Sequence, residues 1–186
     1  SRKPWRTPQF LQDRPLTGRE KGSATHLFMQ FVRYESCTTR EGIRQELVRM
    51  QAEKFLTPRQ AEAVDAEKIL ALFSSELGNR ILHADSLRRE FKFSILADAA
   101  AYDPAAVGEQ VMLQGVVDCF WQEPDGIVIL DFKTDYIHGD LQQKAARYAP
   151  QLRAYAQALS RIYQCPVKKT VLYFFSAGRE VEIDPE

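Results

Sequence analysis

The apolar positions in the first half of the chain recur at intervals of three and four residues, which is the spacing of a helix with one buried face. The pattern predicts helices over 17–32 and 40–55, and Thr17 with Glu20 forms a Thr-x-x-Glu capping box at the start of the first. A third helix is expected to begin after Thr57 and to close at Gly78. The predicted inward-facing residues of the three helices are Ala24, Leu27, Phe28, Phe31, Ile43, Leu47, Met50, Phe55, Ile69, Leu70, Leu72 and Phe73.

The pattern changes to strict alternation after these helices, which is the period of a strand with one buried face. Strands are predicted over 89–96, 109–121 and 127–134, and the last two are joined by the turn "EPDG", in which proline and glycine favour the turn dihedrals. A helix follows over roughly 141–164, and Pro150 predicts that its first stretch is kinked or separate. Two closing strands, 168–175 and 179–183, surround Ala177 and Gly178.

This order of elements predicts an α/β or α+β fold with a mixed sheet. The first three strands are expected to form an antiparallel meander, and the helix at 141–164 is long enough to cross over to a parallel strand. Residues 1–16 contain three prolines and no clean period, so we expect an extended lead-in or linker there. Residues 17–186 are then expected to form a single domain, of a size that readily builds a core.

Two charged residues interrupt the apolar strand 127–134. Asp131 and Lys133 are two positions apart, so they point to one face, while Leu130 and Phe132 point to the other. If the turn has a two-residue loop, the numbers of paired residues sum to 249 and Asp118 lies opposite Asp131. If Gly126 is bulged, the sum is 250 and Asp118 turns away. We prefer the first register, because it gathers the polar groups and leaves the apolar ones to the core.

Two opposed carboxylates in a low dielectric favour a bound cation, and Mg²⁺ (with Mn²⁺ as a substitute) prefers carboxylate oxygens. Such an ion activates water, and a nearby lysine stabilises negative charge on phosphorus, so the group suits phosphodiester hydrolysis. The sequence has no G-x-S-x-G, H-E-x-x-H or G-x-x-x-x-G-K motif. The alternative is a solvated face on which Lys133 pairs with one of the two acids.

The stretch "GVVDCFWQEPDGIVILDFKTDY" has the D-x(n)-D-x-K form and resembles the PD-(D/E)XK nucleases. More narrowly, it resembles the RecB-like nuclease domain at the carboxyl end of AddA-type subunits of bacterial AddAB helicase–nucleases. "REKGSATHLFMQF" resembles the G-x-x-x-H helix of that family, "YAPQLRAYAQAL" its Q-x-x-x-Y motif, and "PVKKTVLYFFSAGREVEI" its closing strands. The resemblance implies a restriction-endonuclease-like core: a mixed central sheet flanked by helices, with an N-terminal helical segment.

The resemblance also implies roles for individual residues. Metal ligands would be Asp118, Asp131, the Phe132 carbonyl and His26, with Glu90 as an acid that can reach the same site. Lys133 would be the catalytic lysine, and Gln151 and Tyr155, four apart on a helix face, would orient it or a DNA phosphate. For His26, Glu90, Gln151 and Tyr155 the alternative is ordinary packing or surface exposure.

Three further positions have open interpretations. Gly115 would allow close approach of backbone or mark a simple bulge. Arg147 and Tyr148 would contact DNA or be merely solvent-exposed.

Composition limits the partners rather than the fold. The 186 residues are 45% hydrophobic and 27% charged with a formal net charge of zero, so bulk charge gives no attraction to nucleic acid or membrane. Cys37, Cys119 and Cys165 are far apart and form no C-x-x-C pair, so we expect free thiols in a cytoplasmic protein without an iron–sulfur cluster. No apolar run approaches a membrane span.

The expected function is therefore that of a Mg²⁺-dependent exonuclease-type DNase domain in double-strand-break processing and recombinational repair. It would be part of an ATP-dependent helicase/nuclease and would act on a single strand from unwound duplex. The resemblance implies two partners, the rest of an AddA chain and an AddB-type subunit. The alternatives are a non-catalytic DNA-binding or subunit-contact module of the same fold, and a stand-alone nuclease of phage or CRISPR type.

Overall fold

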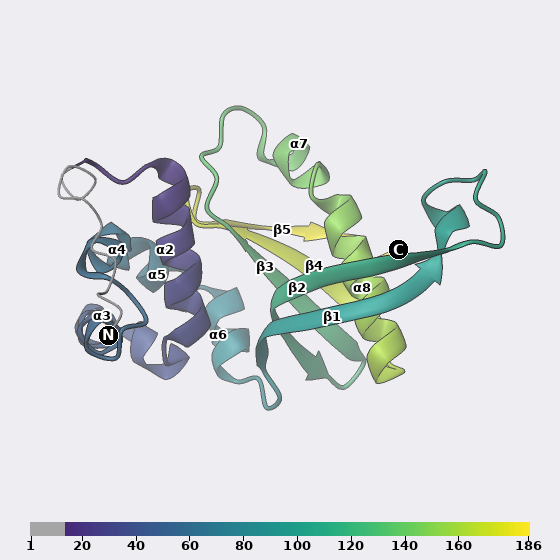
Figure 1. Ribbon diagram of the computed structural model, residues 1–186. Helices are drawn as coiled ribbons and strands as arrows, with labels where there is room; N and C mark the ends of the chain where they lie inside the picture. Colours follow the sequence, from purple (N-terminus) through teal and green to yellow (C-terminus); the bar gives the residue numbers. More distant parts are fainter. Residues whose placement is uncertain (1–13) are drawn as a thin grey trace, which may run out of the picture.

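A mixed five-stranded sheet separates two helical layers in the computed structural model, which describes residues 14–186 (Figure 1). Helices α2 to α6 (residues 18–82) gather on one side of the sheet and α8 (Ala149–Tyr163) crosses the other side. The long hairpin of β1 (Arg88–Asp98) and β2 (Gln110–Glu123) projects away from both layers (Figure 1). Of the lead-in expected over residues 1–16, residues 1–13 lie outside the described part.

The helices of the first layer begin at side-chain caps that can be recognised in the sequence. Thr17 and Thr57 each form the predicted capping box, with Glu20 and Gln60. The helices are α2 (Gly18–Phe31), α3 (Arg40–Ala52), α4 (Pro58–Ala63), α5 (Ala66–Phe73), α6 (Glu76–Leu82), α7 (Leu141–Ala146) and α8 (Ala149–Tyr163), with the 3-10 helices η1 (Tyr34–Thr38) and η2 (Ala99–Ala101).

The single helix predicted from Thr57 to Gly78 is wrong, because this segment forms α4, α5 and the first three residues of α6. Asp65 accepts hydrogen bonds from the amides of Glu67 and Lys68, and Ser75 accepts one from Gly78, so each caps a new helix. Gly78 lies inside α6 and is not a C-cap. A Cβ atom there would lie 2.2 Å from the Leu72 carbonyl oxygen, so glycine permits the close packing of α6 on α5.

The strands are β1 (Arg88–Asp98), β2 (Gln110–Glu123), β3 (Gly126–Lys133), β4 (Val167–Phe174) and β5 (Arg179–Ile183), in the order β1-β2-β3-β4-β5. The first three form the predicted antiparallel meander, and β3 pairs with β4 in parallel through the α7–α8 crossover. Pro150 lies in the first turn of α8, so the predicted separation of α7 from α8 is confirmed.

Each face of the sheet has its own hydrophobic core. Leu130 and Phe132 of β3 pack with the α2–α6 layer, whereas Ile127 and Ile129 pack with α8. The strand is therefore buried on both faces, which explains its nearly continuous apolar sequence. Within residues 14–186, no helix has the length and apolar character needed to cross a membrane.

Candidate active site

The β2–β3 hairpin has the register that brings the two acids together. Glu123 pairs with Gly126 and Cys119 with Leu130, so paired numbers sum to 249 as predicted. Gly126 has a φ of +145°, which suits glycine at the end of this turn. Asp118 and Asp131 follow directly after the last of these pairs, and Asp118 Oδ2 accepts a hydrogen bond of 2.9 Å from the Phe132 amide. The two acids are therefore neighbours on adjacent strands.

Asp131 and Lys133 lie on the α8 side of β3, as the alternation of side chains predicts. Asp131 is only 3% exposed. Lys133 Nζ lies 2.7 Å from Asp131 Oδ2, and this ion pair neutralises a charge that burial would otherwise make costly. The contact lacks hydrogen-bond geometry, and Asp131 Oδ2 accepts no hydrogen bond from any residue in 14–186. A buried carboxylate oxygen of this kind still has lone pairs to offer.

His26 reaches the same place from α2. Its Nε2 donates a hydrogen bond of 2.8 Å to the Phe132 carbonyl and lies 3.7 Å from Asp118 Oδ2. Its Nδ1 lies 3.1 Å from the Gly22 carbonyl one helical turn earlier. Carbonyl oxygens only accept, so this arrangement places a proton on both ring nitrogens. Two residues predicted to bind metal, His26 and Phe132, thus bind each other in this structure.

At Glu90, the alternate side chains of β1 and β2 pass from one face of the sheet to the other, and the sequence does not reveal this change of face. Arg89 and Cys119 contact the α2–α6 layer, but Phe91 and Val117, two residues away on each strand, pack against α8. The register does not shift between these pairs. Instead Glu90 has a φ of +51°, a left-handed conformation that a glutamate adopts at a cost in energy.

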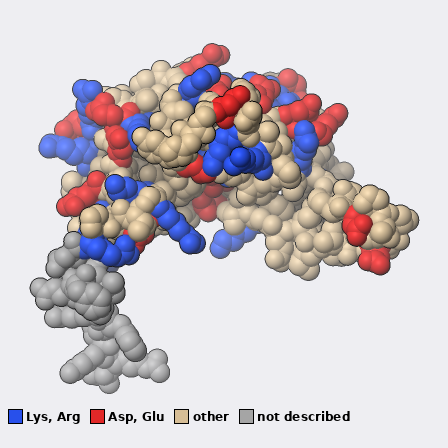
Figure 2. Space-filling view, turned by 90° about the horizontal axis from the view of Figure 1, so that it is seen from above, with Lys and Arg blue, Asp and Glu red and all other residues tan. Residues whose placement is uncertain are grey.

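This change of face occurs beside the acids. Glu90 lines a small cavity with His26, Asp118 and Phe132, so the predicted third acid does border the site. The surface between the helical part and the projecting hairpin is hollowed, and both acidic and basic side chains reach the hollow (Figure 2).

Helix α8 supplies the polar groups beyond Lys133. Gln151 Oε1 accepts a hydrogen bond of 3.1 Å from Lys133 Nζ, and Gln151 Nε2 donates one of 3.0 Å to the Tyr155 hydroxyl. The two residues share a helix face as predicted, and Gln151 contacts the lysine directly. A Cβ atom on Gly115 would lie 2.8 Å from Tyr155 Cε1, so this glycine makes room for an aromatic ring and is paired with Phe93 without a bulge.

Tyr148, for which the sequence left a DNA contact or solvent exposure open, contacts the lysine. Lys133 Nζ lies 4.1 Å from the centre of its ring, a cation–π contact, and the Tyr148 hydroxyl donates to Asp135. The signal that could have indicated this contact is the position of Tyr148 just before α8, which brings its aromatic ring close to the end of β3. Arg147 beside it is exposed.

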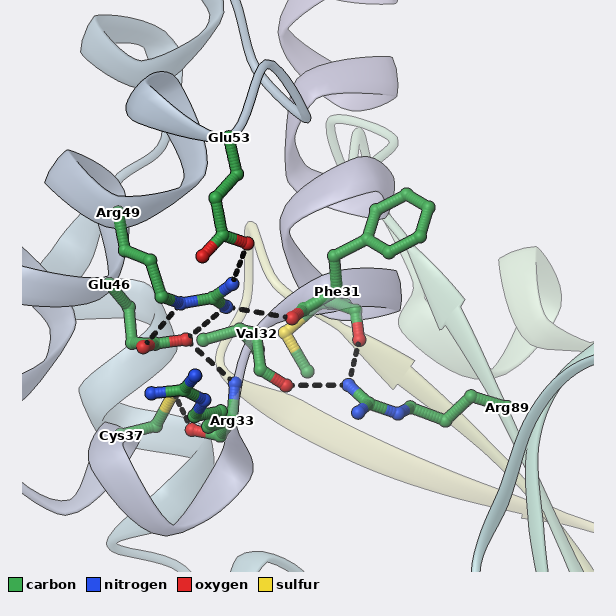
Figure 3. Close-up of polar contacts among 9 residues, drawn as sticks. Phe31, Val32, Arg33, Cys37, Glu46, Arg49, Glu53 and Arg89 are labelled. Carbon is green, nitrogen blue, oxygen red and sulfur yellow. Dashed lines mark hydrogen bonds and ion pairs between the residues drawn. The ribbon is translucent and has the colours of Figure 1, made fainter.

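The carboxyl end of α2 is held by arginines from other elements, which fixes the helix that carries His26 (Figure 3). Arg49 of α3 donates to the Phe31 carbonyl at 3.0 Å. Arg89 of β1 donates to the Met29 and Val32 carbonyls at 3.1 and 2.7 Å. The last turn of α2 has no basic residue of its own, so these side chains satisfy its terminal carbonyls and complement the helix dipole.

The same network is anchored by a buried acid. Glu46 accepts a hydrogen bond of 2.8 Å from the Arg33 amide and forms an ion pair of 2.6 Å with Arg49 (Figure 3). Arg49 also forms an ion pair of 2.7 Å with Glu53. The pKa of Glu46 is lowered, mainly by its hydrogen bond with Arg49, so the acid stays ionised.

The site concentrates opposite charges in a poorly solvated place. Burial, followed by the negative charge of Asp118, raises the pKa of Asp131 to about 6. The Asp118 carboxylate raises the pKa of His26 to about 9, although burial opposes this change. Burial and Asp118 also raise the pKa of Glu90. A cation beside these acids would favour their ionised forms, so the acids are suited to binding one.

The donors of the site fit a hard divalent cation. They include the carboxylates of Asp118 and Asp131 and the carbonyl of Phe132, and the Asp131 Oδ2 atom has unused accepting capacity. As the side chains lie here, however, no three His, Cys, Asp or Glu residues in 14–186 form a group that could hold a metal ion. His26 and Lys133 are instead the positive groups that offset the acids.

Comparisons with known proteins agree with this arrangement. The sequence profile of the PD-(D/E)XK nuclease superfamily matches residues 4–185. The chain is 41% identical to an ATP-dependent helicase/nuclease subunit of Bacillus cereus (strain Q1), over 98% of this chain and 16% of the relative. It is 39% identical to the protein of the same name from Clostridium novyi (strain NT), over 95% of this chain and 15% of the relative.

The chain therefore spans about one sixth of the length of these relatives. The family profile covers nearly all of the chain, including the hairpin with both acids, Lys133 and the α8 residues. The sheet with its parallel β3–β4 pair and flanking helices is the fold expected of that family. The chain belongs to the PD-(D/E)XK nuclease superfamily.

Proposed function

We propose that this chain is a Mg²⁺-dependent deoxyribonuclease domain that hydrolyses phosphodiester bonds of single-stranded DNA. The observation that carries the proposal is the buried Asp131 Oδ2 atom, which accepts no hydrogen bond within residues 14–186 and lies beside Lys133. The ion pair with Lys133 offsets the charge of this acid, and the lone pairs of its Oδ2 atom remain available to a cation. Mn²⁺ is expected to substitute for Mg²⁺.

Asp118, Asp131 and the Phe132 carbonyl are the proposed ligands, with His26 and Glu90 at the border of the site. When bound, a divalent cation supplies Lewis acidity that activates water and offsets charge on the phosphate. His26 would have to lose its Nε2 proton before it could bind the cation as well. Until then it donates to the Phe132 carbonyl and orients that group.

Lys133 is the proposed catalytic lysine. Its ammonium group is held by Asp131, by the Gln151 carbonyl oxygen and by the ring of Tyr148. These contacts hold the ammonium group in place, so it can position the attacking water or stabilise negative charge on the phosphate. Tyr155 acts on the lysine through Gln151, so we class both as positioning residues.

The names of the relatives support a wider role. A protein called an ATP-dependent helicase/nuclease joins a motor to a nuclease, so we propose that this domain cuts a strand unwound by such a motor during double-strand-break processing and recombinational repair. The proposed partners are the rest of an AddA-type chain and an AddB-type subunit. We place the domain in the cytoplasm, which is consistent with its three free cysteines.

The test is cleavage of a 5′-labelled single-stranded oligonucleotide by the 186-residue chain with Mg²⁺ or Mn²⁺. We expect cleavage that EDTA stops and that Asp131→Ala removes. Asp125→Ala is the matched control, because Asp125 lies at the turn end of the same hairpin and its side chain is 73% exposed. Calorimetric Mn²⁺ binding that is lost in Asp131→Ala would support the metal site independently. Normal cleavage by Asp131→Ala would refute the proposal, and absence of both cleavage and metal binding would favour a non-catalytic module.

A further inference from the structure

A groove leads away from the candidate active site along α2. The small cavity at Glu90 and Asp118 shares His26 with a second cavity of about 450 Å³, which is also lined by Gly22, Thr134 and Tyr136. The second cavity shares Gly22, Thr134 and Tyr136 with a third of about 570 Å³, which extends to α5. We call this series of adjoining cavities, which share lining residues, the α2 groove. Its two larger parts are each in the size range of pockets that hold a small organic ligand.

Tyr136 lines both of the two larger cavities, and none of the roles described for the active site explains its position there. The residue is 77% exposed, although a ring of this size usually buries much of its surface. The ring is tilted by 38° against His138, with 5.4 Å between the ring centres, so a neighbour supports one side of it. An exposed, supported ring beside a groove is the arrangement that proteins use to stack unpaired bases.

The charge of the α2 groove indicates how a strand would be held. In its two larger parts the basic and acidic lining residues are equal in number, Arg19, Lys21 and Lys68 against Glu62, Asp65 and Asp135, and the small part adds the acids Glu90 and Asp118. Phosphate attraction alone therefore gives little affinity. A strand held here would depend on stacking contacts with base faces, and free base faces are available only in a strand that is not paired.

We propose that Tyr136 is a base-stacking site for single-stranded DNA, and that the α2 groove leads the strand from this ring to the cleavage site at His26 and Asp118. The inference rests on the proposed function and adds to it the surface that selects an unpaired strand. A duplex has its bases already stacked on one another and offers no free face to the ring.

Fluorescence anisotropy with a labelled single-stranded oligonucleotide in EDTA tests the proposal without any cleavage. We expect Tyr136→Ala to raise the dissociation constant on the order of tenfold, as loss of one stacked base does, and Tyr136→Phe to change it by less than about twofold. Tyr102→Ala is the matched control, since Tyr102 is also largely exposed, at 51%, but lies on the hairpin away from the groove. An oligonucleotide with abasic positions throughout should bind the original chain and Tyr136→Ala equally.

Two results would overturn the inference. One is equal affinity of the original chain and Tyr136→Ala for the normal oligonucleotide. The other is an equal loss of affinity for the abasic strand, which would make Tyr136 a backbone contact or a structural residue. Both are separate from failure of the proposed function, because the EDTA assay measures binding alone and the Asp131→Ala assay measures cleavage.

Discussion

Gly22 of α2 lies directly against Thr134, the residue that follows β3. A Cβ atom built on Gly22 would lie 2.5 Å from Thr134 Oγ1 and 3.4 Å from Thr134 Cβ. The glycine therefore sets how closely α2 approaches the end of β3. His26, one turn later, depends on that approach to reach the Phe132 carbonyl at 2.8 Å. This contact is a physical reason for the G-x-x-x-H spacing noted in the sequence.

We predict that Gly22→Ala lowers the cleavage rate by about 10- to 100-fold, because α2 or Thr134 must move and the groups of the site are displaced. The same change should leave thermal stability nearly unchanged. The cost of the close contact with Thr134 is offset by the higher helix propensity of alanine, which is worth up to about 1 kcal/mol over glycine. Gly18→Ala gives the helix-propensity effect alone in thermal melts, because its added Cβ meets no atom within 4 Å.

Adding Thr134→Ala to Gly22→Ala should restore most of the activity. The second substitution removes Oγ1, and the remaining contact at 3.4 Å is ordinary van der Waals packing. A double variant as inactive as Gly22→Ala would show that the contact does not control the position of His26.

Substitutions of Lys133 and of Asp118 should affect catalysis and metal binding separately. Lys133→Ala is expected to lower the cleavage rate by at least about 10²-fold, as loss of one charge-stabilising donor does, with Mn²⁺ affinity in calorimetry nearly unchanged at pH 8. The pH matters because Lys133 lowers the pKa of Asp131, and that pKa rises when the lysine is removed. Asp118→Asn should instead weaken Mn²⁺ binding. Lost affinity in Lys133→Ala, or full affinity in Asp118→Asn, would contradict these assignments.

Gln151 should affect turnover more than substrate binding. Gln151→Leu removes the acceptor at 3.1 Å from Lys133 Nζ and leaves the ammonium less well oriented. We expect kcat to fall about tenfold and KM to change little, because the lost interaction acts mainly in the transition state. Gln157→Leu on the same helix is the matched control, since Gln157 is exposed and accepts a hydrogen bond from Tyr102. A rise in KM alone would make Gln151 a substrate contact.

The turn ending in Gly126 is compatible with two parities of the strand pairs, and the observed register was predicted because it gathers the polar side chains on one face and leaves the apolar ones to the core. The change of face at Glu90 could not be predicted, since no residue type there announces a positive φ. The breaks in the helix expected over 57–78 were missed because the apolar spacing continues across Asp65 and Ser75, where local caps decide the outcome.

The position of His26 was predictable only through the resemblance. Its contacts depend on Arg49 and Arg89, which come from other elements and hold the end of α2. Tyr148 was missed for a similar reason, because its contact with Lys133 depends on how the start of α8 packs against the end of β3.

Glu123 secures the turn end of the site hairpin, and its ionisation should make stability depend on pH. It forms ion pairs of 2.6 Å with Lys168 and 2.8 Å with Arg80, and its Oε1 accepts a hydrogen bond of 3.0 Å from Trp121. The hydrogen bond with Lys168 is the largest cause that lowers the pKa of Glu123 to about 2 from an ordinary value of 4.5. The folded state therefore binds this proton less readily than the unfolded state does.

A lowered pKa contributes stability above pH 4.5, and this contribution is lost as the pH falls toward 2. Glu123→Gln should thus lower the free energy of unfolding at pH 7 by on the order of 1 kcal/mol, a value reduced by solvent screening of a partly exposed group. In urea titrations, the difference in free energy of unfolding between the original chain and Glu123→Gln should shrink as the pH falls from 4.5 toward 2. Asp125→Asn is the control: Asp125 also pairs with Lys168, but its side chain is 73% exposed, so its effect should be smaller. A Glu123→Gln difference that stays constant from pH 7 to pH 2.5 would show that shape, and not charge, secures the turn.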